Sequence, residues 1–241
     1  MKYLFLFITS FVFAQQSKKV DFIAMNAHLQ PNAIEKSISG KVIYDFIVKS
    51  KIDTIKIDAV KMDFSDVKIN GKSVPFKNSE KSLNLYKGFK KGKNKVEFIY
   101  SAKPKQTMYF VDNQIWTQGQ GKYTSHWLPS FDDVNEKVIF TISAEFRNDF
   151  TVLTNGVLKN TTVNSKGNLK TWNYQMQKPM SSYLVMLAIG KFAKQTETAK
   201  SGTLLEFYLK EEDSDKFATT YKYSAAIFDF FEREIGVNYP W

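Results

Sequence analysis

The chain has 241 residues, no cysteine, two histidines, and 34 Lys+Arg against 24 Asp+Glu, which gives a formal net charge of +10. The absence of cysteine excludes a disulfide framework, a thiolate metal site and a cysteine nucleophile. The 43% of hydrophobic residues excludes a disordered chain, and the length allows one or two domains with a large core.

The positive charge comes almost entirely from lysine, because Arg147 and Arg233 are the only arginines. Arginine is the usual reader of phosphates and base edges, since its guanidinium group is bidentate. The densest basic patch consists of Lys87, Lys90, Lys91, Lys93 and Lys95, interrupted by Gly88 and Gly92. Such glycines favour a hairpin loop whose lysines protect a turn or sheet edge. We therefore expect no nucleic-acid partner.

The amino terminus has the pattern of a signal peptide. Met1 and Lys2 precede an apolar run over 3–14, which is too short to span a bilayer. Val12 and Ala14 present modest or small side chains at the positions that a signal peptidase inspects. We predict cleavage after Ala14 and an exported protein, periplasmic or extracellular, with no transmembrane segment after cleavage. The alternative is a buried first strand.

From about residue 20 to 200, apolar residues recur with a period of two, which is typical of half-buried strands. The clearest runs lie at 42–48, 96–100 and 138–146. Asn70-Gly71 predicts a two-residue hairpin, and Asn155-Gly156 follows the apolar residues 150–153 in the same way. Many short strands with regular turns predict a mainly β fold, with antiparallel sheets packed as a sandwich or saddle.

Two later segments complete the β pattern. Residues 166–168 form a turn signal before the predicted strand at 171–174. The continuous apolar run over 183–189 predicts a strand buried on both faces.

The pattern changes near residue 200. A linker at 199–202 is followed by a predicted strand at 203–209, and the acidic residues 211–215 supply a cap and acids for a helix. Apolar residues then follow at helical spacing up to Ile235, and Gly236 is a natural stop. A helix with such a stripe needs a packing partner, so we expect that 203–241 opens a second domain.

No self-sufficient catalytic constellation is found in the chain, and no catalytic or metal-binding residue is assigned. There is no nucleophile elbow, phosphate-binding glycine loop or dinucleotide fingerprint. Ser181-Ser182 favours the start of a strand, and Asp132-Asp133 favours a turn or cap over an acid pair. His28 and His126 lack the spacing of a zinc helix.

Residues 115–121 differ from ordinary scaffold, because Gln118 and Gln120 alternate with Gly119 and Gly121. A glutamine carbonyl can accept a hydrogen bond from an ammonium group, and glycine permits close approach of a ligand to the backbone. Taken alone, these residues favour a loop.

Five short motifs occur in one order along the chain: 117–120 (Thr-Gln-Gly-Gln), 127–132 (Trp-Leu-Pro-Ser-Phe-Asp), 154–156 (Thr-Asn-Gly), 179–184 (Pro-Met-Ser-Ser-Tyr-Leu) and 190–192 (Gly-Lys-Phe). Together with 230–232 and Tyr239-Pro240, they make the chain resemble the amino-terminal portion of the aminopeptidase N-type zinc metallopeptidases, the gluzincins. The resemblance covers essentially the whole mature chain.

The resemblance implies a saddle-shaped β-sandwich followed by a thermolysin-like catalytic domain. It places the loop with Gln118 and Gln120 in the active site, where the residue matching Gln120 helps to hold the free α-amine of a peptide substrate. Glutamine at this position is similar to the leukotriene-hydrolase branch and its bacterial relatives. The family often has cysteine where Ser130 stands, a departure that concerns packing more than chemistry.

The family's Gly-x-Met-Glu-Asn strand, His-Glu-x-x-His zinc helix and catalytic tyrosine are absent, so we expect them beyond Trp241. The expected organisation is a signal peptide over 1–14, a β domain over 15–202 and an incomplete catalytic domain over 203–241. Zinc is then a cofactor of the intact parent, and the catalytic domain is a missing partner. This fragment alone should bind no zinc and cleave no peptide. The alternative is a secreted β-sandwich binding or scaffold module without a catalytic parent, and the encoded sequence after Trp241 would discriminate between the two.

Overall fold

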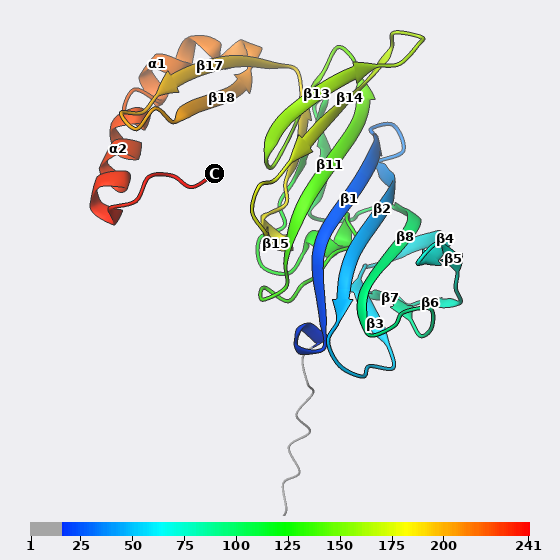
Figure 1. The fold of residues 1–241 in the computed structure, drawn as a ribbon. Coiled ribbons are helices and arrows are strands. Elements are labelled where there is room, and N and C mark those ends of the chain that lie inside the picture. Colours follow the sequence, from blue (N-terminus) through cyan, green and yellow to red (C-terminus); the bar gives the residue numbers. More distant parts are fainter. Residues whose placement is uncertain (1–15) are drawn as a thin grey trace, which may run out of the picture.

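The structure is a computed structural model that describes residues 16–241, so the predicted signal peptide over 1–14 lies outside the described residues. The predicted mainly β fold is confirmed. Long curved strands form a β-sandwich, and a smaller unit of one hairpin and short helices follows at the carboxyl-terminal end (Figure 1).

The large sheet of the sandwich contains the longest strands. Its order is β13 (Val157–Val163), β14 (Leu169–Gln175), β11 (Lys137–Arg147), β1 (Val20–Asn32), β2 (Ser37–Val48), β8 (Gly92–Ala102), β4 (Met62–Ile69) and β5 (Lys72–Ser73). The short β15 (Met180–Ser181) pairs with β11, and the 3-10 turn η1 (Gln16–Lys18) precedes β1.

One strand pair corrects the expectation of antiparallel sheets. β1 and β11 run parallel, with Ala24 opposite Ile139, whereas the other pairs of this sheet are antiparallel. A tight hairpin forces its two strands to be antiparallel, but β1 and β11 are joined by the long excursion over 33–136. Sequence periodicity fixes which face a strand buries and says nothing about the direction of a distant partner.

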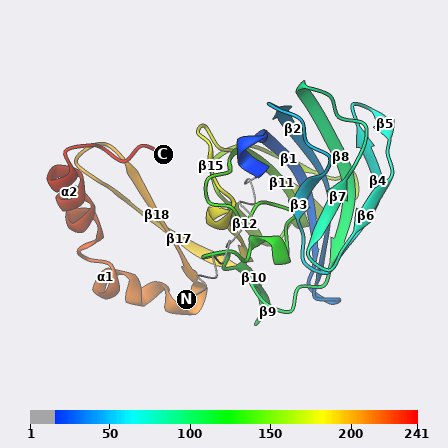
Figure 2. The same ribbon diagram turned by 90° about the horizontal axis from the view of Figure 1, so that it is seen from below.

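Two small sheets complete the sandwich. One has the order β12 (Thr151–Thr154), β16 (Leu187–Gly190), β10 (Gln114–Thr117) and β9 (Met108–Val111), and the other β3 (Ile55–Asp58), β7 (Ser82–Leu85) and β6 (Phe76–Asn78). Figure 2 shows them beside the large sheet, and one hydrophobic cluster joins buried residues of all three sheets. This cluster is the core of the sandwich.

The alternation seen in the sequence decides which residues enter the core. In β2, Val42, Tyr44 and Phe46 are buried, as predicted. The Phe22 ring lies 5.2 Å from that of Phe46 and 4.2 Å from that of Phe131, measured between centroids. Such aromatic contacts add roughly 1 kcal/mol each to the gain from burial.

The predicted turns are confirmed where the two strands that flank the turn pair with each other. Asn70 and Gly71 have φ of 53° and 78° and join β4 to β5, as the hairpin prediction requires. The signal at Asn155-Gly156 was wrong as a hairpin, because β12 pairs with β16 and β13 pairs with β14. There the chain passes from one sheet to the other. The turn predicted at 166–168 does join the paired strands β13 and β14.

The prediction of one doubly buried strand over 183–189 was also wrong. Ser182–Leu184 forms the 3-10 turn η3, and the strand β16 begins only at Leu187. Leu184 is 47% exposed and Met186 is 37% exposed. Apolar content alone does not distinguish a turn plus a short strand from one longer strand.

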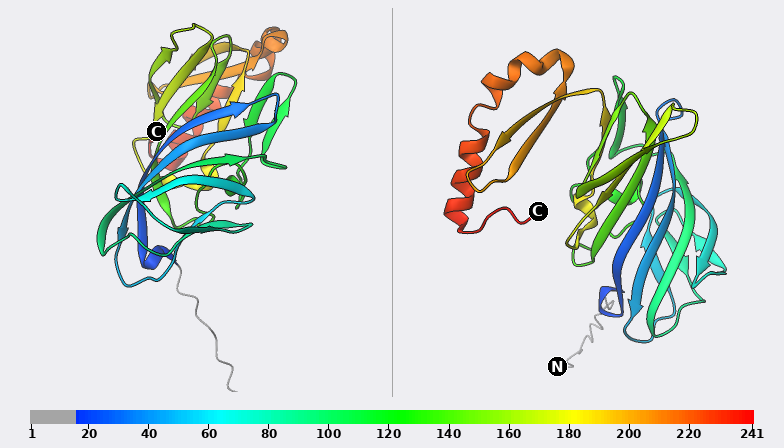
Figure 3. Two further views of the ribbon diagram at one scale, coloured as in Figure 1. Left: turned by 90° about the vertical axis from the view of Figure 1, so that its right-hand side faces the viewer. Right: turned by 45° about the horizontal axis from the view of Figure 1, so that its top comes forward.

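The carboxyl-terminal unit contains the hairpin of β17 (Phe192–Thr198) and β18 (Leu204–Lys210), then η4 (Glu211–Lys216), α1 (Phe217–Thr220) and α2 (Ser224–Ile235). The predicted strand and helical stripe are present, but the helix is interrupted at 221–223 and no side chain caps its segments. Gly236 ends α2 with φ of 74°, as predicted. Figure 3 shows this unit lying to one side of the sandwich. Over residues 16–241, no helix is long and apolar enough to cross a membrane.

Candidate functional site

The loop with the two predicted site residues, 118–123, connects β10 to the 3-10 turn η2 (Thr124–His126). Gln118 and Gln120 are both exposed. Within residues 16–241 their side-chain amides form no hydrogen bond, whereas the backbone N–H of Gln118 donates to the carbonyl oxygen of Thr107 at 2.8 Å. The loop therefore holds its backbone on the sandwich and leaves both amides accessible.

Gly119 is buried, unlike its two glutamine neighbours. A Cβ at this position would collide with Oγ1 of Thr124 and lie 3.1 Å from the carbonyl oxygen of Tyr183. The sequence suggested that glycine lets a ligand approach the backbone. In the structure, the missing side chain of Gly119 instead lets the loop backbone pack against Thr124 and Tyr183 of the same chain.

Below the loop, the segment 127–131 is fully part of the core. Two buried tyrosines donate their hydroxyl groups to its backbone, Tyr44 to the carbonyl oxygen of Pro129 at 2.7 Å and Tyr100 to that of Trp127 at 3.0 Å. Burial raises the pKa of both tyrosines, because the phenolate loses its hydration. Both remain hydrogen-bond donors at neutral pH and hold this segment in place.

Ser182 links this segment to the loop. Its carbonyl oxygen accepts a hydrogen bond from Thr124 Oγ1 at 3.0 Å, and its hydroxyl group accepts one from the backbone N–H of Phe131 at 3.3 Å. Ser182 and Thr124 are each 1% exposed. The sequence assigned Ser181-Ser182 to the start of a strand, and no sequence signal predicted this contact across 58 residues.

Asn155 holds the chain that follows Ser182. Its side chain accepts a hydrogen bond from the backbone N–H of Met186 at 2.7 Å and donates one to the carbonyl oxygen of Leu184 at 3.1 Å. The hydroxyl group of Thr117, next to Gln118, accepts from the N–H of Leu187 at 2.8 Å. Four motifs that are far apart in the sequence therefore meet under one loop.

Two carboxylates, those of Asp58 and Asp132, make hydrogen bonds to the segment 125–132. Asp58 Oδ2 accepts the backbone N–H of Asp132 at 2.8 Å, and Asp132 Oδ2 accepts the hydroxyl hydrogen of Ser125 at 3.0 Å. Burial, followed by the charge of Asp58, raises the pKa of Asp132 to about 6. Burial likewise raises the pKa of Asp58.

The predicted turn role is confirmed for Asp133 alone. Its Oδ1 accepts the backbone N–H of Asn135 at 3.0 Å, and this bond holds the pKa of Asp133 below its ordinary value. Asp132 instead faces Asp58, from which it is 74 residues distant. The sequence offers no sign of that pairing.

Glu136 is a further acid buried in the sandwich, 4% exposed. Its carboxylate accepts the backbone N–H of Phe22 at 3.0 Å, close to the bulge in β1. Burial raises the pKa of Glu136 to about 7, although the bond from Phe22 lowers it in part. This acid stabilises an irregular strand and faces the core away from solvent.

The described residues do not fit a zinc site. Across 16–241 no cluster of three or more His, Asp or Glu side chains has metal-binding geometry. His28 lies in β1, and His126 lies 3.2 Å from the amide nitrogen of Gln106. Partial burial lowers the pKa of His126, so its ring is neutral at pH 7.

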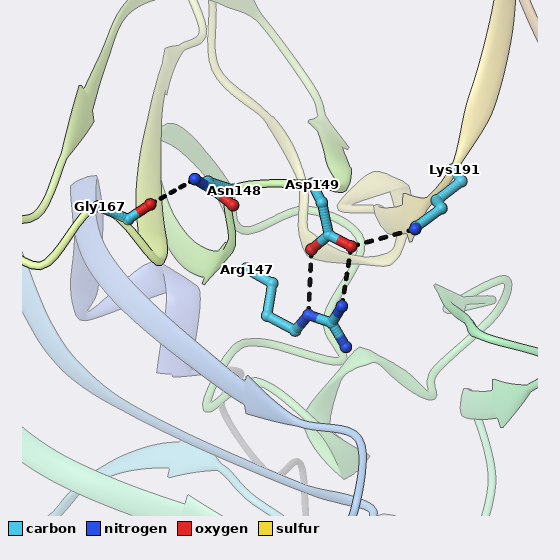
Figure 4. A network of polar contacts seen from close by, with 5 residues as sticks. All are labelled: Arg147, Asn148, Asp149, Gly167 and Lys191. Carbon is cyan, nitrogen blue, oxygen red and sulfur yellow. Dashed lines mark hydrogen bonds and ion pairs between the residues drawn. The ribbon is translucent and has the colours of Figure 1, made fainter.

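The junction between the sandwich and the carboxyl-terminal unit carries a charged network (Figure 4). Arg147 binds Asp149 through two hydrogen bonds of 3.0 and 2.8 Å, and Lys191 Nζ lies 3.1 Å from Asp149 Oδ2. The hydrogen bonds from Arg147, and to a smaller extent that from Lys191, hold the pKa of Asp149 below its ordinary value. Lys191 stands between β16 and β17, so Asp149 ties the junction to the sandwich.

Two cavities accompany the sandwich. One of about 770 Å³ lies at the β1–β2 and β9–β10 turns, and its wall includes Phe110, Phe146 and Phe150. The other, of about 500 Å³, is lined by residues of 155–184 together with Tyr239 and Trp241. Neither wall contains Gln118 or Gln120.

The β-sandwich and the buried base of the loop form one β domain. Residues 23–184 match the family described as the Peptidase M1 N-terminal domain, so the chain belongs to this family. The resemblance to the aminopeptidase N-type peptidases is thereby confirmed.

The relatives are aminopeptidases. A probable aminopeptidase 2 of Sulfurisphaera tokodaii is 29% identical over 155 residues, which cover 62% of this chain and 20% of that protein. The puromycin-sensitive aminopeptidase of Caenorhabditis elegans is 26% identical over 211 residues, 88% of this chain and 20% of that protein. The chain thus spans about a fifth of the length of these curated relatives.

Solved structures share the fold. Aminopeptidase A of Legionella pneumophila, in complex with aspartic acid, superimposes with a TM-score of 0.83 at 15% identity, covering 92% of this chain and 28% of that chain. An M1 zinc metallopeptidase of Deinococcus radiodurans, bound to a Tyr-Ser-Ala substrate, gives 0.78 at 15% identity, covering 91% and 54%.

Proposed function

We propose that this chain is the amino-terminal part of an exported zinc aminopeptidase that removes amino-terminal residues from peptides. In this proposal the loop 118–123 forms the amine-side wall of the active site. The observation that carries the proposal is the convergence under this loop of motifs shared with the family, while Gln118 and Gln120 stay accessible. Membership of the Peptidase M1 family supports it.

The chemistry of the two glutamines suits a free α-amine. Each side-chain carbonyl has two lone pairs that can accept N–H hydrogen bonds from an ammonium group. An amide acceptor carries no full charge, so its attraction for a cation is weaker than that of a carboxylate. Recognition of the amine then depends on acidic residues elsewhere in the active site, in addition to Gln118 and Gln120.

Zinc belongs to this proposal as a cofactor of the whole enzyme. No residue of 16–241 is assigned to the metal, because the described side chains do not fit it. The contribution assigned to this chain is to bind and orient the amino end of the peptide. We expect elemental analysis of the isolated chain to find no stoichiometric zinc.

The division of the chain also remains a proposal: a signal peptide over 1–14, a β domain over 15–202 and the start of a catalytic domain over 203–241. Pairing of β17 with β18 argues for a domain boundary nearer to Lys191. Export is tested by amino-terminal sequencing of the secreted form. A first residue far from Gln15 would contradict the cleavage site.

The site is tested by Gln120→Ala in the intact parent enzyme, which includes the catalytic domain. Loss of one neutral acceptor for an ammonium group costs about 1–1.5 kcal/mol, so we expect KM for an aminoacyl arylamide to rise roughly tenfold with little change in melting temperature. The matched control is Gln195→Ala, which removes an exposed glutamine of β17. Equal kinetics for the two variants would remove Gln120 from the site.

A further inference from the structure

The loop 118–123 contributes few bonds of its own. Its backbone N–H groups make one hydrogen bond to another segment, from Gln118 to Thr107, and Tyr123 accepts one from His126 inside the following turn. Both glutamine side chains are exposed. The position of the loop therefore depends on what lies beneath Gly119.

Beneath Gly119 lies the hydroxyl group of Thr124. This group donates to the carbonyl oxygen of Ser182 at 3.0 Å, and the next carbonyl oxygen, that of Tyr183, lies 3.1 Å from a Cβ built on Gly119. The loop backbone thus lies directly on a hydrogen bond between two segments that are 58 residues apart. A buried bond of this kind is costly to break, because the carbonyl group would remain unpaired.

The lower side of this bond is also fixed. Phe131 N–H donates to Ser182 Oγ, and Asn155 holds Leu184 and Met186 through its side-chain amide. Movement of the 182–186 segment would therefore break several bonds at once. The support under Gly119 is rigid, while the glutamines above it are free.

We propose that Thr124 and Ser182 are positioning residues for the substrate loop. Their hydrogen bond supports the loop backbone at Gly119 and so fixes where the side chains of Gln118 and Gln120 lie. The proposal rests on the proposed function for its kinetic consequence alone. The support of the loop backbone by this hydrogen bond is the mechanical part of the proposal, and it concerns contacts within this chain alone. Because Thr124 contacts Gly119 and neither glutamine side chain, it acts through the loop backbone.

The mechanical part is tested by Thr124→Val, which keeps the shape of the side chain and removes the hydroxyl group. We expect amide hydrogen exchange at Gln118, the loop amide that is hydrogen-bonded to another segment, to accelerate about tenfold, with unchanged exchange in β1 and β2. Thr124→Ser keeps the hydroxyl group and should restore slow exchange. The matched control is Thr161→Val on the exposed strand β13.

If Thr124→Val fails to fold, Gly119→Ala serves as the second variant, because its Cβ displaces the loop while the hydroxyl group remains. It should accelerate exchange at the same amide, that of Gln118. The proposal would be overturned if exchange in the loop is unchanged in whichever variant folds. It would also be overturned if Thr124→Ser does not restore slow exchange. A fall in protection spread evenly over the sandwich would also overturn it, since that result indicates ordinary core packing.

The kinetic consequence is tested in the intact parent enzyme, which includes the catalytic domain. Thr124→Val should raise KM for an aminoacyl arylamide several-fold and leave kcat within twofold, and Thr124→Ser should rescue KM. If exchange accelerates but Thr124→Val and Gln120→Ala both leave KM unchanged, the support of the loop stands and the proposed function fails. If Gln120→Ala raises KM while Thr124→Val changes neither exchange nor KM, the positioning role fails alone.

Discussion

The sandwich and the carboxyl-terminal unit contain similar apolar residues and differ in what covers them. In the sandwich, β2 and β8 bury the aromatic and aliphatic side chains of one face almost completely, for example Tyr44 and Phe98. In α2 no residue is buried, and Phe231 and Ile235 are 55% and 68% exposed. Secondary structure therefore forms in both regions, whereas stabilisation by burial is concentrated in one of them.

The comparison separates pattern from packing. The helical stripe up to Ile235 is as regular as the alternation in β2, but within the described residues only the alternation is fully buried. The stripe makes isolated aromatic contacts, such as that of Phe217 with Phe207, whose ring centroids lie 5.1 Å apart. An amphipathic pattern identifies the face that will be buried. The energy comes only when another surface removes that face from water.

The largest expected difference comes from paired truncations of phenylalanine. Phe22→Ala leaves a cavity in the core and should lower the free energy of unfolding by roughly 3–5 kcal/mol. Phe231→Ala removes an exposed ring and should cost less than about 1 kcal/mol. Denaturant unfolding of both variants measures the difference. Similar costs would show that the carboxyl-terminal unit contributes as much stability as the sandwich.

A smaller difference is expected at two glycines that both have positive φ. Gly156 has φ of 96°, and a Cβ there would lie 2.5 Å from the backbone of Gln175. Gly202 has φ of 88° and open space around it. Gly156→Ala should destabilise by roughly 2–4 kcal/mol and Gly202→Ala by about 1 kcal/mol, because only the first adds a collision to the backbone strain. Thermal or denaturant unfolding of the two variants distinguishes these cases.

The smallest effect concerns the pH dependence of the sandwich. The pKa of Glu136 is raised from 4.5 to about 7 in the folded state, so the folded protein binds more protons than the unfolded chain between these values. Stability from this group is greatest below pH 4.5 and falls as the pH rises towards 7.

Glu136→Gln should abolish that fall and make the variant more stable than the parent at pH 8, by roughly 1–3 kcal/mol. Unfolding free energies measured between pH 5 and 8 test this, with the exposed Glu35→Gln as control. A variant that keeps the full pH dependence would assign it to Asp58 and Asp132, whose pKa values are raised in the same direction.

Local features of the fold were predictable from the sequence. The alternation at 138–146 and the Asn70-Gly71 turn depend on neighbours in the chain, and both are present. Asn155-Gly156 has the same local signal, but its strands belong to different sheets. Turn chemistry describes the bend in the backbone, and the partner of each strand is decided by packing far away in the sequence.

The same limit applies to the candidate site. Gln118 and Gln120 stood out in the sequence as amides between glycines, but only the resemblance assigned them to a site, and their role as amine ligands stays a prediction. The contacts of Thr124 with Ser182 and of Asp58 with Asp132 join residues 58 and 74 positions apart. No periodicity or spacing rule relates such residues, because they become neighbours only when the sheets are assembled.

The parallel pairing of β1 with β11 has a consequence for the order of folding. β1 can form its hairpin with β2 early, since the two strands are adjacent in the chain. Its other edge must wait for residues roughly 115 positions later, and closing so large a loop is slow. Until β11 arrives, the growing chain carries an open strand edge at what will become the middle of its sheet, where another chain can pair. The β1 edge, which is internal in the finished sheet, is thus open to pairing with another chain until β11 has been made.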